Sequence, residues 1–202
     1  MMKYKICGLM CEMDAEYLNV VRPDYAGMIF APNRRRTVTH ETALAIRQRL
    51  DRSIPAVGVF VAAEIAEIQR LVRRDIIQLV QLHGQEDADY LKRLRRAVDV
   101  PIIQAFRIVD ADDLARAMQS QADYILLDHG IGGTGESFDW SLVRNIERPF
   151  FLAGGLTPEN AVEAARLEPY CLDVSSGVET DGKKDFEKIK AFAQAVQLIR
   201  NA

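Results

Sequence analysis

The chain has 202 residues, of which 49% are hydrophobic and 27% charged, and its formal net charge is −3. This length suits one substantial hydrophobic core rather than two enzyme domains, and the composition excludes a disordered chain. The slight acidic excess argues against a nucleic-acid partner, which usually requires a basic surplus, and favours a small-molecule substrate. We therefore expect a single catalytic domain over residues 1–202.

The three cysteines, Cys7, Cys11 and Cys171, are few and odd in number. They fit a reducing compartment better than a disulfide scaffold. We find no signal-peptide segment, no apolar run of membrane-spanning length and no histidine or cysteine spacing that suggests a metal site. The expectation is a cytoplasmic protein with no membrane partner and no metal.

Short apolar runs alternate with longer amphipathic stretches along the chain. In chain order we expect strands at residues 4–7 and 25–30, a helix at 41–50, a strand at 56–60, a helix at 64–72, a strand at 77–82, a helix at 90–98, a strand at 102–106, a helix at 111–118, strands at 124–127 and 150–152, a helix at 158–167, a strand at 172–174 and a helix at 186–198.

The strand runs are apolar at both odd and even positions, which indicates parallel strands covered by helices on their outer faces. Repeated strand-then-helix order predicts right-handed crossovers. Roughly eight such units predict an α/β fold, a single (β/α)8 TIM barrel that is compact beside the ~250 residues typical of that fold. A doubly wound open sheet is the alternative. In both folds the active site lies beyond the carboxyl ends of the strands.

Reactive or cationic residues follow the first two strands. Cys7 closes the first, where its thiolate would serve as base or nucleophile if a nearby positive charge lowered its pKa from about 8.5. Its alternative role is that of a small buried hydrophobe. Arg34, Arg35 and Arg36 follow the second strand. A guanidinium clamps carboxylates and phosphates in a bidentate fork, although a solvated loop is the alternative.

Polar residues also close the fourth and sixth strands. Gln81 and His83 share one parity, so both are expected to point into the barrel mouth as substrate contacts. Asp128 ends an apolar strand, where a carboxyl is costly unless it is used or paired. Burial favours its protonated form and hence a general acid, while capping a turn is the alternative. A glycine-rich loop at 130–135 follows.

Two small-residue loops follow the last two strands. Gly154 and Gly155 come after the seventh, with Thr157 as expected N-cap and residue 158 as the first helical position. Ser175 and Ser176 come after the eighth. Exposed amides in such loops bind anions, and loops at these two places form the usual phosphate site of barrels.

Several stretches resemble phosphoribosylanthranilate isomerases. They are KICGL at 5–9, VGVFV at 57–61, VQLHG at 80–84, LLD at 126–128 with GGTG at 132–135 and FDW at 138–140, AGGLTPENA at 153–161 and DVSSGVE at 173–179. They run in order over essentially the whole chain. The resemblance implies an isomerase of tryptophan biosynthesis that performs an Amadori rearrangement of N-(5-phosphoribosyl)anthranilate without a cofactor or metal.

The resemblance also implies roles for the residues at the strand ends. Asp128 falls on the general acid, which opens the ribose ring, and Cys7 on the general base, which takes the proton from the second sugar carbon. Arg36 falls on the arginine that holds the anthranilate carboxylate. The phosphate falls to the loops at Gly154-Gly155 and Ser175-Ser176.

Three places depart from the family pattern. They are the first loop at 10–13, Gln104, which replaces a common lysine, and the loop at 128–132, which is short. Three other functions are open. A histidine-pathway isomerase would act on two phosphates, but the loop at 60–64 has no glycine pair. A cysteine-nucleophile enzyme would use Cys7 and His83, and a third alternative is a non-catalytic phosphate-binding barrel. The chain is either a monomer or a homodimer.

Overall fold

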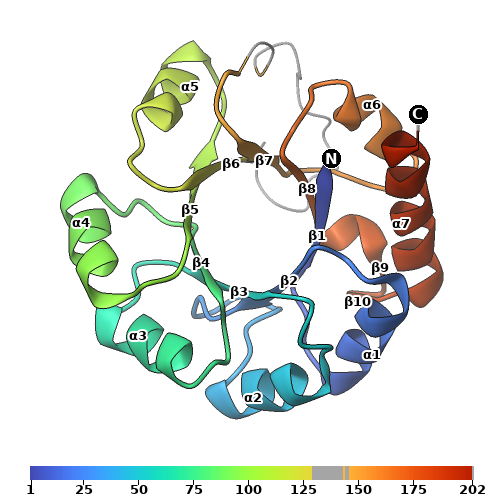
Figure 1. Cartoon of the computed structure of the whole chain (residues 1–202), viewed down its shortest axis with the longest axis horizontal. Coiled ribbons are helices and arrows are strands. Elements are labelled where there is room, and N and C mark those ends of the chain that lie inside the picture. The colour runs from blue at the N-terminus through green and yellow to red at the C-terminus, as the bar shows by residue number, and fades with distance from the viewer. Residues whose placement is uncertain (129–142, 144–145, 202) are drawn as a thin grey trace.

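Eight parallel strands close into a barrel in chain order (Figure 1). The computed structural model describes residues 1–128, 143 and 146–201. The strands are β1 (Lys3–Cys7), β2 (Tyr25–Ile29), β3 (Ala56–Phe60), β4 (Leu79–Leu82), β5 (Ile102–Arg107), β6 (Tyr124–Asp128), β7 (Phe150–Leu152) and β8 (Cys171–Val174). Because β8 pairs with β1 through Lys5 and Asp173, among others, the sheet has no free edge. The predicted (β/α)8 barrel is confirmed.

Helices surround the barrel (Figure 1). They are α1 (Glu12–Val21), α2 (His40–Arg49), α3 (Ile65–Arg73), α4 (Ala88–Ala97), α5 (Ala111–Met118), α6 (Ala161–Ala165) and α7 (Phe186–Arg200). Their buried residues pack on the outward side chains of the strands to form the larger apolar core. Within the described ranges, none of these helices is both long and apolar enough to cross a membrane.

Two helices differ from the prediction. Helix α1 was not predicted, because Cys11 rather than serine or threonine is its N-cap, with Asp14 completing a capping box. Helix α6 is much shorter than the expected 158–167, and Thr157 is not its N-cap. The Asn160 side chain accepts from the Thr157 amide at 2.8 Å and donates to the Gly155 carbonyl at 2.9 Å. These bonds hold the preceding turn out of the helix.

A short hairpin lies between β8 and α7 and was not predicted. It follows the 3-10 turn η2 (Ser176–Val178) and consists of β9 (Glu179–Thr180) and β10 (Lys183–Lys184). The antiparallel pairing sets Lys184 opposite Glu179. The hairpin thus returns a lysine to the end of β8, beside the loop that follows this strand.

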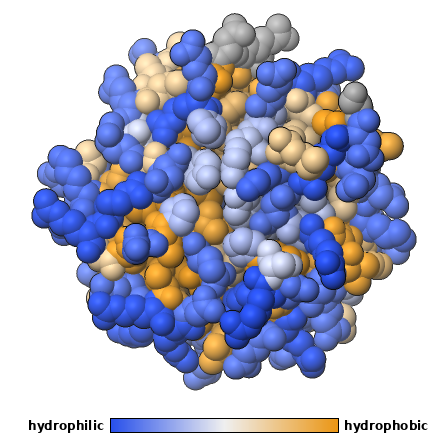
Figure 2. All heavy atoms as spheres, viewed as in Figure 1, coloured by the Kyte–Doolittle hydropathy of each residue, from blue (hydrophilic) through white to orange (hydrophobic). Residues whose placement is uncertain are grey.

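Inward-facing side chains fill the barrel in layers. One cluster of them is apolar and contains Tyr25, Val57, Leu79, Ile103, Ala105, Leu126, Phe151, Ala153 and Cys171. Buried polar side chains also face inward, because the same parity brings Lys5, Gln81 and Asp173 inside. Figure 2 shows that hydrophilic residues cover most of the outer ring of the viewed face, with apolar residues in patches nearer the centre.

Candidate active site

Cys7 lies at the carboxyl end of β1, which opens into the barrel mouth. It is 7% exposed, and Gly27 on β2 makes room for it, because a Cβ there would lie 2.7 Å from the Cys7 Sγ. Burial raises the pKa of the Cys7 thiol, and the positive charge of Lys5 offsets part of that rise. The thiol is therefore close to a cation that favours its thiolate form.

Lys5 lies two residues below Cys7 and is fully buried. Its Nζ lies 2.6 Å from Oδ2 of Asp173 and 2.9 Å from Oε1 of Gln81. Burial raises the pKa of Asp173, against the opposing charge of Lys5. Within the described part of the chain, Oδ1 of Asp173 is buried without a hydrogen-bond partner. A buried acceptor in this state is available to a donor that enters the mouth.

Gln81 connects Lys5 to the opposite side of the mouth. Its Nε2 lies 2.9 Å from Nδ1 of His83, and Nε2 of His83 lies 3.3 Å from Oδ2 of Asp128. We call Lys5, Gln81, His83 and Asp128 the polar chain. Asp128 was predicted to be buried, but its side chain is 26% exposed. Its carboxyl therefore has an open side from which a substrate can reach it.

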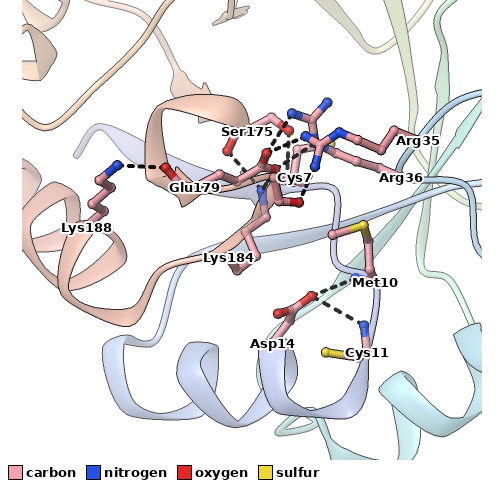
Figure 3. Close-up of polar contacts among 11 residues, drawn as sticks. Cys7, Met10, Cys11, Asp14, Arg35, Arg36, Ser175, Glu179, Lys184 and Lys188 are labelled. Atoms are coloured by element: carbon pink, nitrogen blue, oxygen red, sulfur yellow. Dashed lines mark hydrogen bonds and ion pairs between the residues drawn. The ribbon is translucent and has the colours of Figure 1, made fainter.

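A second ionic group occupies the rim beside β8. Glu179 accepts from Nε and Nη2 of Arg36 at 2.6 and 2.8 Å, from Nη2 of Arg35 at 2.6 Å and from Nζ of Lys184 at 2.9 Å. Figure 3 shows these four residues, which we call the Glu179 cluster. Burial alone would raise the pKa of Glu179, but the three cations outweigh it and lower the pKa to about 2.

Arg36 keeps one side of its guanidinium available. Glu179 takes the side formed by Nε and Nη2, and no described residue bonds to Nη1. The remaining edge of Nη1 and Nη2 can hold a second carboxylate in a bidentate fork. Gly8, with φ +82°, lets Arg36 approach, since a Cβ there would lie 2.6 Å from the Arg36 Cδ. The absence of a side chain at Gly8, the residue after Cys7, therefore leaves room for the Arg36 side chain.

The loops after β7 and β8 lie against each other. A Cβ on Gly177 would lie 1.9 Å from the Leu156 carbonyl oxygen, so the two backbones are in direct contact. Gly154 and Gly155 have φ of 90° and 66°, values that favour glycine. Ser175 Oγ donates to the Cys7 carbonyl at 3.0 Å, which ties the second loop to β1. These small-residue loops lie at the end of the barrel that also holds Cys7.

Residues 4–195 match the family model described as N-(5'phosphoribosyl)anthranilate (PRA) isomerase. The chain belongs to the phosphoribosylanthranilate isomerase family. A member of this family from Endomicrobium trichonymphae is 43% identical over 206 residues, covering 100% of both chains. Another, from Lactiplantibacillus plantarum, is 46% identical over 197 residues and covers 96% of this chain and 91% of its own. The predicted resemblance is confirmed.

Solved structures of the family have the same fold over the whole chain. The phosphoribosyl anthranilate isomerase of Thermotoga maritima aligns with a TM-score of 0.90 at 35% identity, covering 98% of this chain and 99% of its own. A second structure, at 34% identity and TM-score 0.87 with the same coverage, is a phosphoribosyl anthranilate isomerase in complex with reduced 1-(o-carboxyphenylamino)-1-deoxyribulose 5-phosphate.

The structure brings most of the residues predicted for the family's site into the barrel mouth or its rim. Cys7, Gln81, His83 and Asp128 line the mouth, and Arg36 lies on the rim. The loop at 130–135 and the motif at 138–140 lie outside the described residues.

Sequence reasoning missed Lys5, Asp173, Glu179 and Lys184 as functional candidates. A usable signal was present for two of them. Lys5 interrupts an apolar strand on the parity of Cys7, and Asp173 does the same on β8. A charge at a buried strand position needs a partner, and the closing pair of strands supplies it.

Proposed function

We propose that this chain isomerises N-(5'-phosphoribosyl)anthranilate by an Amadori rearrangement, with Asp128 as general acid and Cys7 as general base. The observation that supports these roles best is their placement. A partly exposed carboxyl ends β6 and a buried thiol ends β1, three strands away around one barrel mouth. Each group can then face a different atom of one bound sugar.

The first step opens the ribose ring. Asp128 donates its proton to the ring oxygen while the bond between that oxygen and the first sugar carbon breaks. The anilino nitrogen supplies the electron pair and becomes the nitrogen of a protonated Schiff base. Asp128 is left as a carboxylate, 3.3 Å from Nε2 of His83.

The second step moves hydrogen between carbons. The Cys7 thiolate takes the proton from the second sugar carbon, and the electron pair moves into the carbon–carbon bond as the Schiff base becomes an enolamine. The Asp128 carboxylate then takes the hydroxyl proton on the second carbon and the Cys7 thiol protonates the first carbon, which gives the ketone and restores both groups. Hydrogens move within one molecule, so an acid and a base suffice, and we propose that no cofactor takes part.

The substrate carries an anion at each end, and the site offers a group for each. The open edge of Arg36 suits the anthranilate carboxylate. The loops containing Gly154-Gly155 and Ser175-Ser176 suit the phosphate, in line with the usual phosphate position of this fold. Direct substrate contacts from Gln81 and His83 stay a prediction.

The proposal includes a reducing, cytoplasmic setting. Cys7, Cys11 and Cys171 are all free thiols. An oxidised Cys7 could not accept the proton from the sugar, so the proposed chemistry requires the reduced form. Whether the chain works as a monomer or a homodimer stays a prediction, which size-exclusion chromatography with light scattering can test.

The test is the decay of phosphoribosylanthranilate fluorescence after the purified protein is added. We expect Cys7→Ser and Asp128→Asn each to lower kcat by about 10²–10⁴-fold, the usual contribution of a positioned acid or base. Cys171→Ser is the matched control, because Cys171 is a buried thiol at the first residue of β8, the end of the strand away from the mouth. Nearly full activity in Cys7→Ser or Asp128→Asn would disprove that residue's role. A covalent adduct on Cys7 detected by mass spectrometry would favour the cysteine-nucleophile alternative.

A further inference from the structure

The orientation of the Gln81 side-chain amide is fixed by Lys5. A lysine ammonium has three donors and no acceptor, so the atom 2.9 Å from Nζ must be the amide oxygen. The NH2 group of Gln81 is then the group that lies 2.9 Å from Nδ1 of His83. Both ends of the amide have a partner, and Gln81 is 2% exposed. The amide cannot turn over without losing its bond to Lys5.

This orientation decides which nitrogen of His83 carries a proton. Because the NH2 group of Gln81 can only donate, Nδ1 of His83 must accept and therefore has no hydrogen. A neutral imidazole carries one proton, which must then lie on Nε2. That nitrogen is the one 3.3 Å from Oδ2 of Asp128.

The other two states of His83 would interfere with a general acid at Asp128. An imidazolium would place Nδ1–H against the Gln81 NH2 group and would pair with the Asp128 carboxylate, which disfavours protonation of the acid. The neutral Nδ1–H form would make Nε2 an acceptor for the Asp128 proton. Only the Nε2–H form leaves that proton for the substrate and also donates toward the carboxylate formed after transfer.

We propose that Gln81 is a positioning residue whose amide, oriented by Lys5, holds His83 as the neutral Nε2–H tautomer and so keeps the Asp128 proton available to the substrate. The consequence for catalysis rests on the proposed function. The tautomer itself does not, because it follows from the hydrogen bonds of the polar chain alone.

Charged groups from several elements surround His83. Lys5 on β1 and Asp173 on β8 form a buried ion pair behind Gln81, and Asp128 ends β6. Arg107 ends β5 in register with Asp128. Glu86, in the loop after β4, directs its carboxylate to the amides of residues 62 and 84. His129 lies outside the described residues.

Nuclear magnetic resonance of the full-length protein tests the tautomer directly. Long-range ¹H–¹⁵N correlations of the imidazole rings distinguish Nε2–H, Nδ1–H and imidazolium, and the sequence has three histidines to assign. The His83→Gln variant identifies the His83 signals by their absence. We expect Nε2–H at pH 7. Observation of Nδ1–H or of imidazolium would overturn the inference, whether or not the protein is an active isomerase.

The variant Gln81→Glu tests the link to catalysis. Its carboxylate accepts a proton from Nδ1–H, so we expect an imidazolium at pH 7 and a fall in kcat of at least about tenfold, with KM changed less than about threefold. The matched control is Gln104→Glu, which makes the same change on the outer side of β5, where Gln104 contacts Ser120 and the Glu86 carbonyl. We expect the His83 signals there to be unchanged.

The outcomes separate the two proposals. A charged His83 in Gln81→Glu together with wild-type kcat would overturn the positioning role. An inactive wild-type protein with the Nε2–H tautomer would contradict the proposed function and leave the tautomer standing. If Gln81→Glu fails to fold, the tautomer of the wild type still decides the inference.

Discussion

Asp173 and Glu179 are two nearby carboxylates with opposite surroundings. Asp173 lies inside the barrel with one cation, Lys5, and one oxygen that has no hydrogen-bond partner among the described residues. Glu179 lies on the rim with three cations, and each of its oxygens accepts at least two hydrogen bonds. Burial raises the pKa of Asp173, whereas the cations lower that of Glu179 to about 2.

The difference shows that the number of hydrogen-bond donors around a carboxyl, rather than burial alone, sets its protonation state in this barrel. Both side chains are nearly inaccessible, at 5% and 4% exposure. Glu179 has a surplus of donors, so it stays ionised and holds its neighbours in place. Asp173 has a deficit, so it retains an acceptor for a further donor.

The largest effect is expected from Glu179→Gln. The change leaves two arginines and a buried lysine without their shared anion, and arginine cannot lose its charge to compensate. We expect a loss of about 3–5 kcal/mol in the free energy of unfolding, measured by urea denaturation at pH 7. KM should also rise, because Arg36 is no longer held.

The pH dependence of that loss provides its check. The pKa of Glu179 is lowered in the folded state, so its stabilisation is present above the ordinary value near 4.5 and is lost as the pH falls toward 2. The difference between wild type and Glu179→Gln should be constant from pH 7 to 5 and shrink below pH 4.5. A difference that already shrinks between pH 7 and 6 would contradict this account.

Lys5→Met should cause the next largest loss in the free energy of unfolding. This loss should change with pH between 7 and 5, above the range expected for Glu179→Gln. Asp173 would be buried without its cation, and the folded protein can escape by protonating it. Protonating a carboxyl whose ordinary pKa is near 3.9 costs about 4 kcal/mol at pH 7 and about 1.5 kcal/mol at pH 5. This cost limits how much the free energy of unfolding can fall when the ion pair is lost. Burial raises the pKa of Asp173, and Lys5 opposes that rise in the wild type. Loss of Lys5 therefore raises this pKa further, so the variant should gain stability relative to wild type as the pH falls from 7 to 5.

The double variant Lys5→Met/Asp173→Leu is the control for Lys5→Met. Replacing a buried ion pair by apolar residues of similar size is often neutral for stability. We expect it to recover most of the loss at pH 7 and to remove the pH dependence between 7 and 5. A penalty in Lys5→Met that is the same at both pH values would show that Asp173 does not take up a proton.

The smallest effect is expected from Arg35→Gln. Arg35 contacts the same carboxylate as Arg36, but its side chain is 50% exposed against 23% for Arg36. An exposed ion pair contributes about 0–1 kcal/mol, so urea denaturation should show a loss below about 1 kcal/mol. A loss equal to that of Glu179→Gln would show that the Glu179 cluster depends on its exposed member.

The barrel was predictable because its strands are apolar on both faces and alternate with helices. The missed or misplaced helices have local causes. Helix α1 begins at a cysteine cap and ends at Arg22 in the left-handed region, so neither end has the usual residue types. Helix α6 was expected to start at a threonine–proline pair, but the Asn160 side chain holds that turn in another conformation.

The site was predictable as far as each strand end could be examined by itself. Cys7 and Asp128 stand out because a reactive side chain closes an apolar run. The connections between strand ends were not predictable, since Lys5 bonds to residues 76 and 168 positions away. The role of Gln81 follows only from knowing which of its amide atoms meets Lys5.

The contact between Gly177 and the Leu156 carbonyl has a practical consequence for barrel engineering. With 1.9 Å between that oxygen and a Cβ on Gly177, no side chain fits at position 177 unless the loop after β7 moves. The two loops therefore cannot be exchanged independently between related barrels. A chimera whose crossover lies between β7 and β8 takes the two loops from different parents. A crossover before β7 keeps both loops from the same parent and is therefore preferred.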